Sequence, residues 1–213
     1  MTGGRRRGPS KGDLREQAIL RVAAAMVAEQ PIAQITIDSL AAAAGISRSS
    51  FYFYFGSKAE VLARLLAPVA AELSQAMVSW SEGGGPDPEP LRAALRRSVG
   101  VWREHRDLLR QVLLDAAPDP VIAPLRARMI GDCIDLTAAR IRRERAAGRA
   151  PAGPPPAETL ARALNQLTFA VLATSPLGVP GDEAEAAVVE LLETVVQRVV
   201  YAATPVWPPT ALT

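Results

Sequence analysis

Cysteine and histidine each occur only once, as Cys133 and His105, in this chain of 213 residues. A single cysteine excludes an internal disulfide and a four-thiolate zinc site, and neither residue has a partner at ligand or catalytic spacing. No charge-free apolar run reaches 18 residues, so we expect no membrane-spanning helix and no membrane partner. The basic N-terminus lacks the apolar segment of a secretory signal, so we expect a cytoplasmic protein.

Enzyme motifs are missing as well. The chain has no GxSxG, GxGxxG, phosphate-binding loop, HExxH or EF-hand sequence. We therefore expect no catalytic residue, no metal and no cofactor. A helical small-molecule carrier or a cofactor-free enzyme remains an alternative, because an apolar pocket leaves little trace in a sequence.

Aromatic residues and net positive charge are concentrated in the first third of the chain. Of ten aromatic residues, five are consecutive at positions 51–55. Residues 1–66 carry nine basic and five acidic side chains, whereas the remaining 147 carry 15 and 17. A basic end on a nearly neutral body indicates a polyanionic partner for that end.

Helical periodicity dominates the chain, and no segment alternates with a period of two, which predicts an all-α fold of about nine helices. The first twelve residues are expected to form a flexible basic arm, 13–66 a DNA-binding domain, 67–204 a ligand-binding and dimerisation domain, and 205–213 a tail. Caps, glycines and prolines place the helices at 13–29, 37–44, 48–54, from 58 to the glycines at 83–85, 90–104, 106–117, 121–148, 157–175 and 182–203.

Two short helices at 37–44 and 48–54 are joined through Gly45, Ile46 and Ser47. One long helix precedes them, and together they form the arrangement of a helix-turn-helix DNA reader. Phe51 and Phe55 are one turn apart and are expected to face inward. The outer surface of the second short helix then carries one arginine, small hydroxyl side chains and two tyrosines. These groups can hydrogen-bond to DNA phosphates and to base edges.

The segment from Thr36 through the run GISRSSFYFYFGSK, which ends at Lys58, resembles the DNA-binding signature of the TetR family, especially its ethionamide-resistance repressor branch. The resemblance implies that Thr36 and Lys58 hold phosphates at helix N-termini. It further implies that the remaining DNA-facing side chains are Ser47, Arg48, Ser49, Ser50, Tyr52 and Tyr54. The alternative for the two tyrosines is a structural role, in which they pack against the first helix.

The last two helices, 157–175 and 182–203, carry an apolar stripe that is wider than one-sided packing requires. A lone helix-turn-helix reads only half of a palindromic site, so we expect a two-fold homodimer through these helices. The alternative is that the stripe completes an internal core.

Large aromatic, aliphatic and sulfur-containing side chains recur in the helices that follow the DNA-binding domain. They indicate a mostly apolar pocket for a small-molecule effector. Asn165 and Thr168 are polar groups on an otherwise apolar helix and require partners, either neighbours or a ligand. The resemblance favours the ligand for Asn165. The candidate ligand-binding residues are Met77, Trp80, Trp102, Met129, Asn165, Thr168, Phe169 and Leu172, and core filling is the alternative for each.

The sequence therefore predicts a DNA-binding transcriptional regulator. We expect a homodimeric repressor that binds a palindromic double-stranded DNA operator and leaves it when an apolar effector binds. The helix that starts at 58 would link the helix-turn-helix to the effector pocket. Its tilt would therefore set the spacing between the DNA-contacting helices, 48–54, of the two subunits. A ligand-independent or activating regulator is the alternative. Arg5–Arg7 form either a solvated tail or an arm that enters an adjacent groove.

Overall fold

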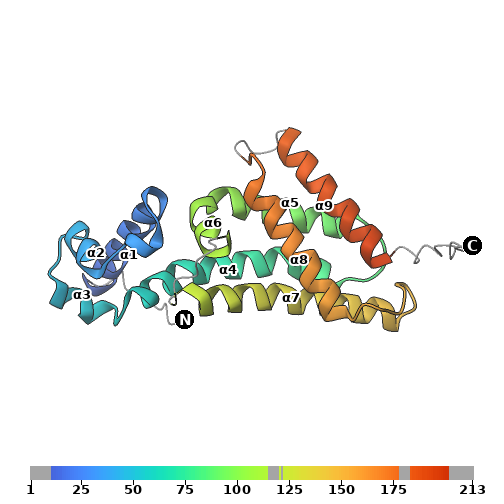
Figure 1. The fold of residues 1–213 in the computed structure, drawn as a ribbon, viewed down its shortest axis with the longest axis horizontal. Coiled ribbons are helices and arrows are strands. Elements are labelled where there is room, and N and C mark those ends of the chain that lie inside the picture. The colour runs from blue at the N-terminus through green and yellow to red at the C-terminus, as the bar shows by residue number, and fades with distance from the viewer. Residues whose placement is uncertain (1–10, 115–119, 121, 178–182, 202–213) are drawn as a thin grey trace, which may run out of the picture. The chain divides into compact units, whose positions relative to one another are not determined.

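The computed structural model describes residues 11–114, 120, 122–177 and 183–201, and these residues form nine α-helices and one short 3-10 helix, with no strand (Figure 1). The all-α prediction is confirmed. The α-helices are α1 Lys11–Glu29, α2 Ile37–Ala43, α3 Arg48–Tyr54, α4 Lys58–Glu82, α5 Glu89–Glu104, α6 Arg106–Leu114, α7 Ile122–Ala146, α8 Ala157–Thr174 and α9 Glu183–Tyr201.

The helix boundaries differ from the predicted ones at a few ends. Helix α1 starts at Lys11, so Lys11 and Gly12 belong to it and not to a flexible arm. Asp13, where the predicted helix begins, lies inside the first turn of α1, where its charge suits the helix dipole. The 3-10 helix η1 (Ile32–Gln34) was not predicted. The predicted arm before Lys11 and the tail after residue 204 lie outside the described residues.

The chain folds into two compact units. Among the described residues, the first contains 11–70, 107–114, 120 and 122–127, and the second contains 71–106, 128–177 and 183–201. Helix α4 therefore contributes residues to both units. By length and composition alone α4 could cross a membrane; Leu62 and Leu73 are among those of its apolar side chains that are buried in the protein.

The core of the first unit is formed where α1, α2 and α3 pack together (Figure 1). Ile19 and Val27 from α1, Leu40 from α2, and Phe51 and Phe55 around α3 are all buried. The short helices form because their first turns are capped, and this apolar seam then holds them in place.

Gln111 of α6 attaches that helix to the end of α1. Its amide oxygen accepts a hydrogen bond from the backbone N–H of Ile32 at 2.7 Å, and its nitrogen donates to the backbone oxygens of Val27 and Gln30. These contacts satisfy backbone groups that the end of α1 leaves open. Residues 107–114 of α6, which lie within the predicted segment 67–204, group with the first unit.

In the second unit α5, α8 and α9 pack on one another (Figure 1). Two ion pairs connect α5 to α9: Arg92 with Glu193 at 2.6 Å and Arg103 with Glu185 at 2.8 Å. The aligned helices enclose the large buried side chains Trp80 and Trp102. This packing positions the cavity described below.

Candidate DNA-contact surface and ligand cavity

The turn between α2 and α3 is built by three local signals. Thr36 caps α2, where its hydroxyl accepts a hydrogen bond from the backbone N–H of Ser39 at 3.0 Å. Gly45 then adopts φ = 66°, a left-handed conformation that favours glycine. Ser47 caps α3 by accepting from the N–H of Ser50 at 3.1 Å. The predicted helix-turn-helix geometry is thus present.

The five aromatic rings separate into a buried and an exposed set. Phe51 and Phe55 are buried, with ring centroids 5.9 Å apart. Tyr52 is 46% exposed and Phe53 is 83% exposed. Tyr54 is partly buried and meets Phe53 edge to face, with centroids 5.2 Å apart. The outer side of α3 therefore presents rings to solvent, and Phe53 is an exposed residue that sequence reasoning assigned no role.

Arg48, at the start of α3, is paired with Asp38 of α2. Its guanidinium donates to the Asp38 carboxylate at 2.6 Å and to the Tyr52 hydroxyl at 3.5 Å. The hydrogen bond to Tyr52 and the pair with Asp38 raise the pKa of Arg48, which stays charged. Sequence reasoning missed Asp38, although an acid in the first turn of α2 was a visible signal.

The other predicted DNA-facing residues surround α3 within the same unit. The hydroxyl of Ser47 lies 2.9 Å from the hydroxyls of both Ser49 and Ser50, and all three are exposed. The Lys58 ammonium donates to the backbone oxygen of Ile32 at 3.1 Å and is half-buried. Thr36 and Lys58 stand at the N-termini of α2 and α4. Contact of these residues with DNA remains a prediction.

A mostly apolar cavity lies in the second unit, between α4, α5, α7, α8 and α9. Met129, a predicted ligand-binding residue, is buried in the core but does not line this cavity. The other seven candidates, Met77, Trp80, Trp102, Asn165, Thr168, Phe169 and Leu172, all line it. Their role in binding a ligand remains a prediction.

Apart from Trp102, sequence reasoning missed the residues that α5 contributes to this cavity. Leu91, Leu95, Ser98 and Trp102 recur at helical spacing and form one wall, a periodicity that could have identified them. The cavity is narrow, since about 50 Å³ is open to the centres of water-sized spheres. That is room for about three or four water molecules, so a larger molecule needs side chains to move.

The polar groups of the cavity are largely occupied by protein partners. Asn165 donates both amide protons, to the Thr137 hydroxyl at 3.0 Å and to the backbone oxygen of Ala161 at 2.9 Å. The hydroxyls of Thr137 and Ser98 donate to backbone oxygens one turn earlier in their helices. The amide protons of Asn165 are therefore satisfied by neighbouring residues, which was the alternative to a ligand in the sequence analysis.

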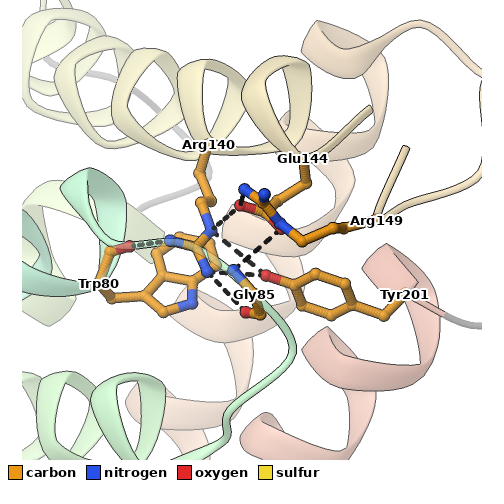
Figure 2. A network of polar contacts seen from close by, with 6 residues as sticks. All are labelled: Trp80, Gly85, Arg140, Glu144, Arg149 and Tyr201. Carbon is orange, nitrogen blue, oxygen red and sulfur yellow. Dashed lines mark hydrogen bonds and ion pairs between the residues drawn. The ribbon is translucent and has the colours of Figure 1, made fainter. Parts of the chain in front are cut away.

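A buried arginine anchors the wall of the cavity formed by Trp80 (Figure 2). Arg140 of α7 is 2% exposed, and the centre of its guanidinium lies 5.5 Å from the Trp80 ring centroid. It donates to the backbone oxygens of Trp80 at 2.9 Å and Gly85 at 2.8 Å, and to the Tyr201 hydroxyl at 2.9 Å. Three elements of the second unit thus converge on one charged group.

Glu144, which is 0% exposed, supplies the negative charge of this network (Figure 2). One carboxylate oxygen lies 3.3 Å from the Nε atom of Arg140. Arg149 donates to both carboxylate oxygens, at 2.8 and 3.0 Å, and the N–H of Gly85 donates at 3.1 Å. These contacts, the Arg149 hydrogen bonds above all, hold the pKa of Glu144 below its ordinary value. Sequence reasoning did not identify this network.

Reactive and metal-binding groups are sparse in the described part of the chain. No group of three or more His, Cys, Asp or Glu residues that could hold a metal ion occurs there. Cys133 lines the cavity, where burial, with a smaller contribution from Asp132, raises its pKa to about 11. Its thiol therefore stays protonated at neutral pH and is a poor nucleophile.

Two family models match consecutive parts of the chain. Residues 19–65 match the model described as bacterial regulatory proteins of the tetR family, and residues 91–202 match the C-terminal domain of the transcriptional regulator EthR. The chain is 36% identical over 193 residues to the HTH-type transcriptional regulator EthR of Mycobacterium tuberculosis, which covers 89% of this chain and 88% of that protein.

Solved structures of the same fold also match. The complex of SmeT, a Stenotrophomonas maltophilia repressor, with triclosan has a TM-score of 0.64 at 23% identity, covering 94% of this chain and 97% of the other. Thermus thermophilus FadR in complex with lauroyl-CoA has a TM-score of 0.58 at 24% identity, covering 89% and 95%. At these identities the similarity concerns the fold.

Proposed function

Because the chain belongs to the TetR family of DNA-binding transcriptional regulators, and so is not an enzyme, we propose that it is a homodimeric cytoplasmic repressor. In this proposal the dimer binds a palindromic operator and leaves it when an apolar small molecule enters the cavity. The observation that carries the proposal is the exposed outer side of α3, with its arginine, hydroxyls and rings.

The proposed DNA contacts divide into base-reading and phosphate-holding groups. Arg48 is a candidate for base edges, because a guanidinium can donate two hydrogen bonds to guanine. Tyr54 is the second candidate for groove contacts. Tyr52, Thr36 and Lys58 are assigned to the sugar-phosphate backbone, where the amides at the starts of α2 and α4 also suit an anion.

Exposed apolar side chains on the last two helices support the dimer. Leu167 of α8 and Leu191 and Val199 of α9 are the large apolar residues that stay exposed there. A second copy would cover them, and its two-fold axis would match the symmetry of a palindrome. We therefore assign the dimer interface to α8 and α9.

The cavity supports a small-molecule effector. It is enclosed by apolar side chains with a few polar groups, as ligand sites commonly are. Complexes of SmeT with triclosan and of FadR with lauroyl-CoA are solved structures of this fold. Helix α4 supplies residues to both units, so a ligand that favours one tilt of α4 would change the affinity for DNA.

DNA binding is tested by selecting an operator from random duplexes and titrating it by fluorescence anisotropy at several salt concentrations. We expect log K to fall by about 0.9 for each phosphate neutralised, per unit of log salt. Arg48→Ala should cost about 1–3 kcal/mol and relax the sequence preference, whereas Lys58→Ala should weaken all sequences alike. Identical behaviour of the two variants would refute the assignment of roles.

The repressor mechanism requires a separate measurement. An effector found by its stabilisation of the protein should lower operator affinity, and the operator should lower effector affinity by the same factor. A compound that fills the cavity tightly and leaves the operator titration unchanged would contradict effector release.

A further inference from the structure

Trp102 holds a polar group that has no partner. The side chain is 1% exposed and lines the cavity, with its ring 6.3 Å from that of Phe169. Its indole nitrogen is buried, and no acceptor for its N–H exists among the residues that the structure describes. A buried tryptophan N–H usually finds a hydrogen-bond partner, because an unsatisfied donor destabilises the fold.

The polar neighbours in the cavity do not satisfy this donor. Asn165 and Thr137 hydrogen-bond to each other, and Ser98 is bonded to its own helix. Trp102 is therefore a lining side chain with an unpartnered donor, in a mostly apolar cavity where the donors of Asn165, Thr137 and Ser98 are used within the protein. A molecule that brings an acceptor can satisfy this donor.

The lining also restricts the charge of that molecule. None of the fifteen lining side chains is an acid, an arginine, a lysine or a histidine. Burial also keeps the Cys133 thiol neutral. A carboxylate or ammonium group placed here would lose its hydration without gaining a counter-ion, which is strongly unfavourable.

We propose that the indole N–H of Trp102 donates a hydrogen bond to the effector, and that the effector is a neutral, largely apolar molecule carrying a carbonyl or ether oxygen. This inference rests on the proposed function, in which the cavity is the effector site. It adds the chemical class of the ligand and the residue that selects it.

The test uses three probes of similar size: acetophenone, ethylbenzene and benzoate. The chain has three tryptophans, so the indole N–H signals of ¹⁵N-labelled protein are few, and loss of a signal in Trp102→Phe assigns Trp102. We expect acetophenone to move the Trp102 proton signal downfield, as a new hydrogen bond does. Ethylbenzene should bind without that downfield shift, and benzoate should not bind.

Affinities measured by calorimetry complete the experiment. The wild-type protein should bind acetophenone about three- to tenfold more tightly than ethylbenzene, the effect of one net hydrogen bond. Trp102→Phe should abolish this preference while retaining an aromatic ring. Met77→Leu, at another lining position without a donor, is the matched control and should change both affinities by the same factor.

Three results would overturn the inference: equal affinity of the wild-type protein for acetophenone and ethylbenzene, tighter binding of benzoate, or an unchanged preference in Trp102→Phe. Failure of the proposed function is a different result. If acetophenone shifts the Trp102 signal but no cavity ligand alters operator affinity, Trp102 recognition stands and effector release does not.

Discussion

Glu144→Gln is expected to lower the free energy of unfolding by about 3–4 kcal/mol, because it leaves the buried charge of Arg140 without an anion. The estimate lies at the lower end of the range of about 3–5 kcal/mol for breaking a buried ion pair. Arg140 keeps its hydrogen bonds to Trp80, Gly85 and Tyr201. The side chain of Arg149 is 44% exposed, so water replaces its lost contact.

The assay is urea unfolding followed by circular dichroism, at one fixed protein concentration because dimerisation would contribute to stability. A loss of this size corresponds to a drop of about 6–16 °C in Tm for a chain of this length. The control is the double variant Arg140→Met with Glu144→Gln. Without an unpaired buried charge, it should be more stable than Glu144→Gln alone.

The pH dependence gives a second measurement of the same network. The pKa of Glu144 is lowered in the folded protein, so its stabilisation is present above the unfolded-state pKa of about 4.3 and is lost as the pH falls below it. The difference between wild type and Glu144→Gln should therefore shrink below about pH 4. A constant difference from pH 7 to 3, or a Glu144→Gln cost below about 1 kcal/mol, would refute the reasoning.

Three further predictions concern other residues. Cys133, with a pKa of about 11, should react with iodoacetamide at pH 8 about a hundredfold more slowly in native than in urea-unfolded protein, and comparable rates would mean that the cavity is open. Gln111→Ala should cost about 1–3 kcal/mol in urea unfolding, because it leaves backbone groups at the end of α1 without partners; Gln111→Glu should cost at least as much, because a carboxylate oxygen would then face the backbone oxygens of Val27 and Gln30, and a Gln111→Glu variant as stable as the wild type would contradict the assigned contacts. Leu191→Arg should convert the proposed dimer to a monomer in light scattering, because the proposed interface would bury an unpaired charge; a dimer that persists would place the interface elsewhere.

Local sequence features made the helix-turn-helix of the first unit predictable. Thr36, Gly45 and Ser47 act on their immediate neighbours, through caps and a left-handed turn, so they are visible in the sequence. The spacing of Phe51 and Phe55 likewise predicted which rings are buried. In both cases a few residues determine the outcome through contacts within one or two turns.

Contacts between distant residues could not be predicted in this way. Gln111 meets Ile32 across 79 positions, and Arg140 meets the backbone of Trp80 across 60. Glutamine and arginine on the surface of an amphipathic helix look the same in a sequence as glutamine and arginine that cap a distant helix end. The shape of the cavity depends on such packing, which is why the sequence did not show that Met129 is absent from its lining.

The stacking of Arg140 on Trp80 determines where the cavity can grow. Rotating Trp80 away from its position would separate the indole from the guanidinium, and that attraction is strongest when both groups are shielded from water. Trp80 therefore serves as a rigid floor. Expansion for a bulkier ligand must therefore come from other lining side chains, such as Met77, which is unbranched and readily changes conformation. The range of compounds that fit the cavity would thus depend on an immobile indole as much as on the adaptable side chains that line it.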